Sequence, residues 1–137
     1  MAKPGKRAMV FGTFDVLHPG HLYFFREAKK RGDKLIVVVA RDATVKKIKG
    51  HKPKLDEHAR REIVSALKVI SEAVLGDKFD WHKLILKYKP NVICLGYDQV
   101  TPKNFEVELR SRGVAPKIIR LKSYKPKKYK SSIILNK

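Results

Sequence analysis

The run Leu35–Ala40, LIVVVA, is apolar at every position. A strand with one wet face alternates apolar and polar residues, whereas a strand covered on both faces is apolar throughout. Strands of the second kind lie in the middle of parallel sheets, between layers of helices. The run therefore predicts a central strand of an α/β fold.

Strand-like and helix-like segments alternate along the rest of the chain. This alternation predicts a parallel sheet with right-handed crossovers. We expect a single Rossmann-like domain over residues 1–137, with five parallel strands in the order 3-2-1-4-5 and helices on both faces. The expected strands are Arg7–Phe11, Leu35–Ala40, Ala73–Leu75, Asn91–Leu95 and Lys117–Leu121. The expected helices are Leu22–Arg31, one from Asp56 to about Ile70, one from Asp80 to about Lys89, and one over about Asn104–Arg112, with Arg41–Pro53 as a basic loop.

Composition sets the class of protein. A chain of 137 residues, 43% of them hydrophobic, suits one folded core. No apolar run approaches the ~20 residues that a membrane span needs, so we expect no membrane association. The one cysteine, Cys94, lies in an apolar run, which favours an inert core thiol and a reducing, cytoplasmic location.

The formal net charge is +19. A positive field attracts anionic substrates, and it also attracts nucleic acid without regard to sequence. A nonenzymatic nucleic-acid-binding protein is therefore an alternative interpretation. Against it, the basic residues are spread along the chain and no RNA-binding motif is visible.

The stretch Met9–His21, MVFGTFDVLHPGH, runs from a strand through a loop into a helix. Gly12 allows a close approach of the backbone, and Gly20 keeps side chains away from the space between His18 and His21. The two histidines thus stand where a strand end meets a helix N-terminus, which is where phosphates bind in open α/β sheets. The alternative is an ordinary Pro-Gly turn with two helix-start histidines.

Two imidazoles at this place suit nucleotidyl transfer. They can donate hydrogen bonds to the α-phosphate oxygens and to the leaving pyrophosphate, where negative charge accumulates. We therefore expect His18 and His21 to be catalytic, with backbone N–H groups of Thr13 and Phe14 offered to phosphate. The candidate nucleotide-binding residues of this segment are Gly12, Thr13, Phe14, Pro19 and Gly20.

A second loop is expected at the same crevice. Strands one and four flank the point where the strand order reverses, so the loops after them should meet. Asp98, in the loop after strand four, can accept a hydrogen bond from a ribose hydroxyl or a base amino group; its alternative role is that of a turn residue. The dinucleotide fingerprint G-x-G-x-x-G and the Walker A sequence are both absent, which argues against a dehydrogenase and a P-loop enzyme.

The segment GTFDVLHPGH resembles the signature of the H-x-G-H nucleotidyltransferases. Together with VVVARD, KIKGHKP, SALKVISEAVLG, LGYDQ and SSII, it makes the chain similar to the cytidylyltransferase-like branch, and most similar to the archaeal FAD synthetases. The resemblance spans residues 7–135. It implies transfer of AMP from ATP to FMN, giving FAD and pyrophosphate. It further implies Mg²⁺ or another divalent ion carried by ATP, no permanent cofactor and no protein metal site, and a homodimer.

The resemblance also points to individual residues outside the histidine motif. Lysines after strand two grip the triphosphate in related enzymes, although solvated surface lysines are the alternative here. Arg60 aligns with an arginine of the cytidylyltransferases, or simply solvates its helix. Hydroxyl residues near the C-terminus bind phosphate in the cytidylyltransferase-like branch. Tyr124 can stack on a base or a flavin, and the alternative is an exposed loop aromatic. The remaining candidates are Asp15, Lys46, Lys47 and Lys49 for phosphate or acceptor, and Ser131 and Ser132 for nucleotide.

Two departures separate the chain from the glycerol-phosphate cytidylyltransferases. Those enzymes carry an R-T-E-G-I-S-T-T segment near the C-terminus, and this chain has lysines in place of its arginine and glutamate. Where they have R-Y-V-D, this chain has Lys68–Ser71, KVIS. Both departures favour an FAD synthetase. A cytidylyltransferase acting on glycerol 3-phosphate or a similar polyol phosphate remains the alternative enzyme.

Overall fold

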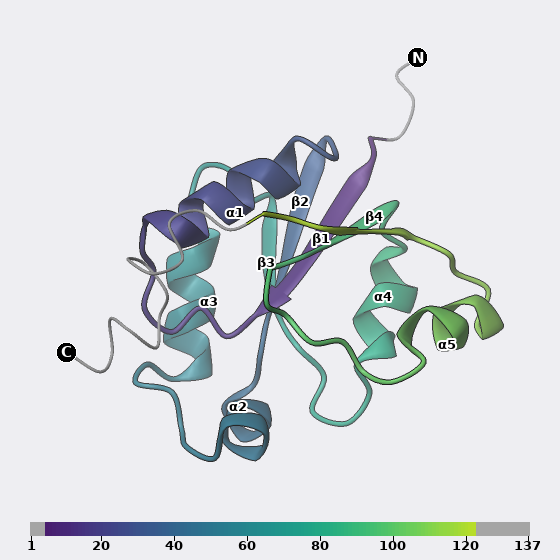
Figure 1. Ribbon diagram of the computed structural model, residues 1–137. Coiled ribbons are helices and arrows are strands. Elements are labelled where there is room, and N and C mark those ends of the chain that lie inside the picture. Colours follow the sequence, from purple (N-terminus) through teal and green to yellow (C-terminus); the bar gives the residue numbers. More distant parts are fainter. Residues whose placement is uncertain (1–4, 123–137) are drawn as a thin grey trace.

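The computed structural model describes residues 5–122 of the chain, and in them a five-stranded parallel sheet with the strand order β3-β2-β1-β4-β5 (Figure 1). The expected order is confirmed. The strands are β1 (Arg7–Gly12), β2 (Lys34–Val39), β3 (Glu72–Leu75), β4 (Val92–Leu95) and β5 (Lys117–Arg120). The helices are α1 (Pro19–Lys29), α2 (Asp42–Lys49), α3 (Glu57–Ser65), α4 (His82–Tyr88) and α5 (Phe105–Ser111).

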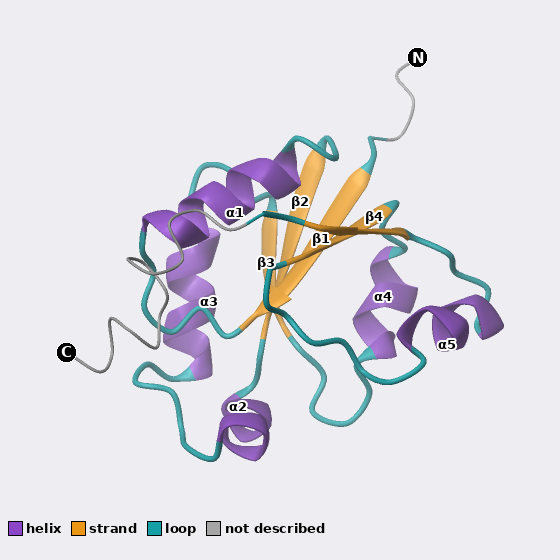
Figure 2. Ribbon diagram, viewed as in Figure 1, coloured by secondary structure: helices purple, strands orange, loops and turns teal. Residues whose placement is uncertain are grey.

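Helices cover both faces of the sheet (Figure 2). The residues of α1 and α3 pack on one face in a core that includes Phe25 and Val64, and the residues of α4 and α5 pack on the other in a core that includes Ile85 and Leu109. In β2, every residue after Lys34 is buried, as expected for a central strand. The order of the strands reverses between β1 and β4, so a crevice between the two helix layers opens at their carboxyl ends. No helix between residues 5 and 122 is long and apolar enough to cross a membrane.

The segment after β2 differs from the expected loop. Residues 42–49 form α2, which buries Val45 and ends at Gly50, a residue in the left-handed region with φ 82°. Glycine tolerates this conformation, and the lysines of the last turn lie at the helix end that favours cations. The loop prediction was wrong because only one residue of this helix is buried, which leaves almost no apolar periodicity to read in the sequence.

Helix α3 begins as expected and ends early. Asp56 is its N-cap, and the Asp56 side chain accepts from the Ala59 N–H at 2.9 Å. The helix stops at Ser65 and not near Ile70, because the chain turns there and delivers the buried Ile70 to the core ahead of β3.

The Arg60 guanidinium connects three segments beneath the carboxyl edge of the sheet. The side chain is fully buried, which excludes the alternative that Arg60 simply solvates its helix. It donates to the Leu55 carbonyl at 2.9 Å, to the Thr13 carbonyl at 2.8 Å, and to the Asp42 carboxylate at 2.6 Å. Arg60 thus fixes the loop after β1 and the start of α2 against α3.

Replacing Arg60 with leucine should lower the free energy of unfolding by about 3–5 kcal/mol, because Asp42 and two carbonyls would lose a buried partner. Urea denaturation measures this loss. The matched control is Arg61→Leu, whose guanidinium makes only a 3.5 Å contact to the Ala73 carbonyl. Equal losses in the two variants would contradict the role assigned to Arg60.

Candidate active site

The two motif histidines form the start of α1. His18 is the N-cap, and its Nδ1 accepts from the Gly20 N–H at 3.1 Å. In return, the His18 N–H donates to Nδ1 of His21 at 3.3 Å. Pro19 occupies the first turn, where its missing N–H costs nothing. The helix therefore begins three residues earlier than expected, with histidines in the capping roles that Ser and Glu usually play.

These backbone contacts fix the state of both rings. Each Nδ1 accepts a hydrogen bond from an N–H group, so the proton of each neutral imidazole is carried by Nε2. Burial, then the charges of His18 and Lys49, lower the pKa of His21 to about 4, and burial also lowers the pKa of His18. The rings lie 4.0 Å apart between centroids. At neutral pH the pair is therefore two uncharged rings that carry Nε2–H donors.

The Phe14 ring supports the ring of His21. Its ring is buried and packs edge-on against the His21 ring, 5.7 Å between centroids, and against Phe25 at 5.1 Å. The Phe14 backbone is left-handed, with φ 53°. A Cβ at position 12 would lie 2.5 Å from the Phe14 ring, so Gly12 is required for this packing. The close approach expected at Gly12 is thus an approach by the Phe14 ring.

The Asp15 carboxylate and the Thr13 carbonyl both accept hydrogen bonds from other parts of the protein. The Thr13 carbonyl accepts from Arg60. The Asp15 carboxylate accepts from the backbone N–H groups of Lys54 at 2.7 Å and Leu55 at 2.9 Å. It thereby holds the segment before α3 against the histidine loop. No local pattern announces this contact, because its partners lie about forty residues away in sequence.

The loop after β4 is tied to β1. The Gln99 side chain accepts from the Gly96 N–H at 3.1 Å and donates to the Phe11 carbonyl at 3.1 Å. Arg120, the last residue of β5, donates to the carbonyls of Gly96 and Gln99, each at 2.8 Å. Asp98 is exposed on this turn, at the carboxyl end of the sheet. The sequence did not predict Gln99 and Arg120 as site residues, although the place of Gln99 just after a strand was a usable signal.

The three candidate lysines lie on α2 and all are exposed. Among Lys46, Lys47 and Lys49, only the charge of Lys49 contributes to lowering the pKa of His21. Lys49 is therefore the candidate lysine that interacts electrostatically with His21.

Tyr124, Ser131 and Ser132 are outside the described residues. Cys94 is a buried core thiol, and burial raises its pKa to about 11. Within residues 5–122, no three His, Cys, Asp or Glu side chains are grouped so that they could hold a metal ion.

Two neutral N–H donors at a helix N-terminus make a site for an anion that gains charge during a reaction. A family model described as cytidylyltransferase-like matches residues 9–137. The chain belongs to the cytidylyltransferase-like family. It is an enzyme of the nucleotidyltransferase class, as the histidine motif led us to expect.

Relatives at high identity are archaeal FAD synthases. The chain is 51% identical to the FAD synthase of Aciduliprofundum boonei over 119 residues. The aligned part covers 86% of this chain and 79% of the relative. It is 47% identical to that of Archaeoglobus profundus, covering 92% and 81% of the two chains. It is 42% identical to the FAD synthase of Thermoplasma volcanium, and the aligned part covers 96% of this chain and 92% of the relative.

Two solved structures share the fold. One is described as a lipopolysaccharide core biosynthesis protein from Thermoplasma volcanium, with a TM-score of 0.84 and 40% identity, covering 88% of this chain and 99% of that one. The other is a pantoate-beta-alanine ligase from Francisella tularensis, with a TM-score of 0.62, covering 91% of this chain and 62% of that one. Its 17% identity supports the shared fold alone.

Folding stability should fall as the pH drops from 6.5 toward 4. The unfolded chain protonates His21 near its ordinary pKa of 6.5, whereas the folded chain does so only near a pKa of about 4, so acid favours the unfolded state between these values. Urea midpoints at pH 7 and pH 5 measure the effect. In His21→Asn, whose side-chain oxygen can replace Nδ1 as acceptor, the decline should be smaller. An unchanged decline would contradict the lowered pKa of His21.

Proposed function

We propose that this enzyme transfers AMP from ATP to FMN and releases FAD and pyrophosphate. The observation that carries the proposal is the pair of Nε2–H donors at the α1 N-terminus, in a chain whose relatives at 42–51% identity are FAD synthases. The alternative acceptor, a polyol phosphate, finds no support among those three relatives. The net charge of +19 serves to attract two anionic substrates, and nucleic acid is bound only nonspecifically.

The proposed reaction is one in-line displacement. An FMN phosphate oxygen attacks the α-phosphorus of ATP, the bond from that phosphorus to the bridging oxygen breaks, and pyrophosphate leaves with the electron pair. The FMN phosphate is itself the nucleophile, so no Ser or Cys is required. His18 and His21 donate from Nε2 to the oxygens that gain charge, and positioning supplies the rest of the acceleration.

Other residues have proposed binding roles. Lys49 contacts the triphosphate, Asp98 accepts from the ribose or base, and backbone N–H groups of Thr13 and Phe14 line the phosphate path. A divalent ion bound to the triphosphate screens its charge when ATP is present. A cytoplasmic location and a homodimer remain proposals of the same kind.

A substrate panel tests the proposal. The purified protein is incubated with each nucleoside triphosphate and either FMN or glycerol 3-phosphate, and both pyrophosphate and FAD are measured. FAD from ATP and FMN is the expected product. Pyrophosphate release only with CTP and glycerol 3-phosphate would replace the proposal with the cytidylyltransferase.

His18→Asn and His21→Asn should each lower kcat by about 10²–10³, because each removes a donor to the charge of the transition state. Asparagine retains an acceptor at the position of Nδ1, so the helix cap and the fold should survive. The KM for ATP should change little. Steady-state kinetics and thermal melting together check this, and a near-normal kcat in both variants would exclude the histidines from catalysis.

Lys49→Gln should raise the KM for ATP about fivefold, whereas Lys47→Gln should change it little. The two lysines are on the same exposed helix, but only Lys49 influences the pKa of His21. Measuring the KM for ATP at low and moderate salt tests the assignment. Equal effects of the two substitutions would indicate a general field and no specific contact.

A further inference from the structure

Helix α2 follows β2 and lies beyond the carboxyl ends of the strands (Figure 1). Among its eight residues only Val45 is buried, and Ile48 is 76% exposed. A short helix with one buried side chain gains little orientation from core packing, which is the main source of helix stability in proteins. The direction of α2 is therefore set mainly by polar contacts at its ends.

Glu57 of α3 caps the start of α2. Arg41, the N-cap residue of α2, makes no side-chain hydrogen bond to its own helix. Instead, the Asp42 N–H donates to Oε1 of Glu57 at 2.9 Å. This hydrogen bond, together with a second one from Arg41, lowers the pKa of the Glu57 carboxyl although burial opposes the shift. Glu57 is therefore a carboxylate at neutral pH, at the helix end that favours negative charge.

The second carboxylate oxygen of Glu57 connects the start of α2 to the end of β3. Oε2 accepts from Nη1 of Arg41 at 2.8 Å, and Nε of Arg41 donates at 2.8 Å to the carbonyl of Gly76, which directly follows β3. The Glu57 side chain is only 14% exposed, so water screens this pair less than it screens a surface ion pair. Arg60 holds the side chain of Asp42, whereas Glu57 holds its backbone. Glu57 thus fixes the first turn of α2 through the main chain.

The direction of α2 decides where Lys49 lies, because this lysine is the last residue of the helix. At the rise of an α-helix, Lys49 stands roughly 10 Å along the axis from Asp42, so a tilt of about 15° at the start moves it by about 3 Å. A displacement of that size breaks a direct contact between an ammonium group and a phosphate oxygen. In the observed direction, the charge of Lys49 contributes to lowering the pKa of His21.

We propose that Glu57 is a positioning residue, which fixes the direction of α2 from α3 and thereby directs Lys49 toward the triphosphate. This rests on the proposed function, in which Lys49 contacts the triphosphate. Glu57 acts through Lys49 and not on the reacting atoms. Its removal therefore weakens nucleotide binding and leaves the chemical step to His18 and His21.

A double-mutant cycle tests whether Glu57 acts through Lys49. The variants are Glu57→Ala, Lys49→Gln and the two combined, and the control is Glu62→Ala, at an exposed position of the same helix. Calorimetric titration with α,β-methylene-ATP and Mg²⁺ gives a Kd without turnover. Steady-state kinetics gives kcat, and thermal melting verifies folding. Glu57→Gln is added because its amide oxygen still accepts from the Asp42 N–H while the ion pair with Arg41 is lost.

Glu57→Ala should raise the Kd about fourfold and keep kcat within about twofold of the parent value. Lys49→Gln should raise the Kd about fivefold. The combined variant should stay near about fivefold and not reach about twentyfold, because Glu57 has nothing to position once the ammonium group is gone. Glu57→Gln should lie between the parent and Glu57→Ala, and Glu62→Ala should match the parent.

Two results would overturn the proposal. A Kd within about twofold of the parent in a folded Glu57→Ala would mean that α2 keeps its direction without the carboxylate. A rise of about twentyfold in the combined variant would mean that Glu57 and Lys49 act independently. If Glu57→Ala folds poorly, the same cycle built on Glu57→Gln decides between these outcomes. Failure of the proposed function is separate, because the parent protein would then bind the analogue yet form no FAD from ATP and FMN.

Discussion

The carboxyl edge of the sheet depends on the buried guanidinium of Arg60. A charge in a protein interior is tolerated only when it is paired and its donors are satisfied. Arg60 meets this condition through one carboxylate and two carbonyls that belong to separate segments of the chain. Its ion pair and hydrogen bonds therefore fix the histidine loop, the start of α2 and the start of α3 in one arrangement. The same contacts hold the start of α2, the helix that carries Lys46, Lys47 and Lys49.

Helix capping uses Nδ1 of each motif histidine and leaves Nε2 for the proposed catalysis. Nδ1 of His18 and of His21 each satisfy a backbone donor at the α1 N-terminus, which stabilises the helix. Because Nδ1 accepts, the proton resides on Nε2, which is the donor in the proposed nucleotidyl transfer. Burial against Phe14 lowers the pKa of His21 and keeps its ring neutral. The site is thus organised before substrate arrives, which is the condition under which hydrogen-bond donors accelerate a reaction most.

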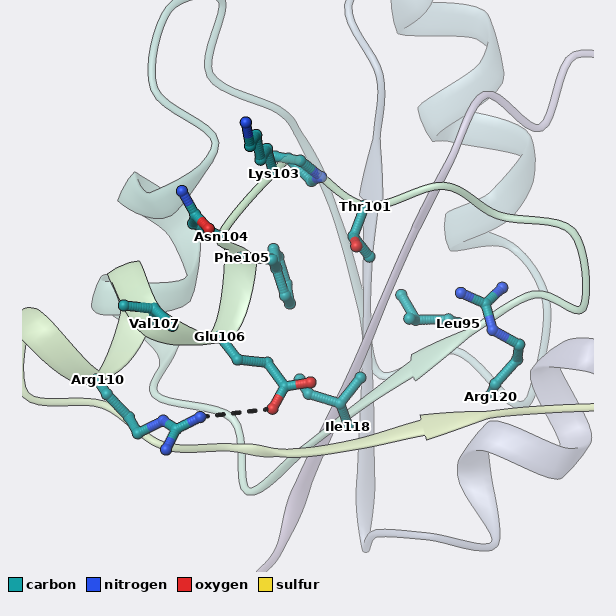
Figure 3. A pocket seen from close by; sticks show the side chains of 11 residues that line it. Leu95, Thr101, Lys103, Asn104, Phe105, Glu106, Val107, Arg110, Ile118 and Arg120 are labelled. Carbon is teal, nitrogen blue, oxygen red and sulfur yellow. Dashed lines mark ion pairs between the residues drawn. The ribbon is translucent and has the colours of Figure 1, made fainter.

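The doubly wound topology brings two unlike walls to the carboxyl edge of the sheet. On the α1 side, backbone and imidazole donors suit a phosphate that gains charge. On the α5 side, a cavity offers apolar surface from Leu95, Phe105 and Ile118 beside the cations Lys103, Arg110 and Arg120 (Figure 3). The loop after β4 joins the two, because Gln99 bonds to β1 while Arg120 holds the loop from β5. Reversal of the strand order between β1 and β4 brings both walls to one crevice.

The sequence determined the architecture and the central chemistry. The unbroken apolar run of β2 and the alternation of elements predicted a parallel α/β sheet, because these signals are local. The histidine motif, together with the family resemblance, predicted the class of reaction. Tertiary structure alone decided what the other polar groups do. Asp15 and Arg60 carry the residue types of a binding site, yet both hold the protein together. Apart from Leu55, which is five residues from Arg60, their partners lie 18 to 47 residues away. The cavity likewise belongs to no single segment, since β4, α5 and β5 each contribute part of its wall. A chain reveals its periodicity directly, but only folding determines which distant donors and acceptors satisfy one another.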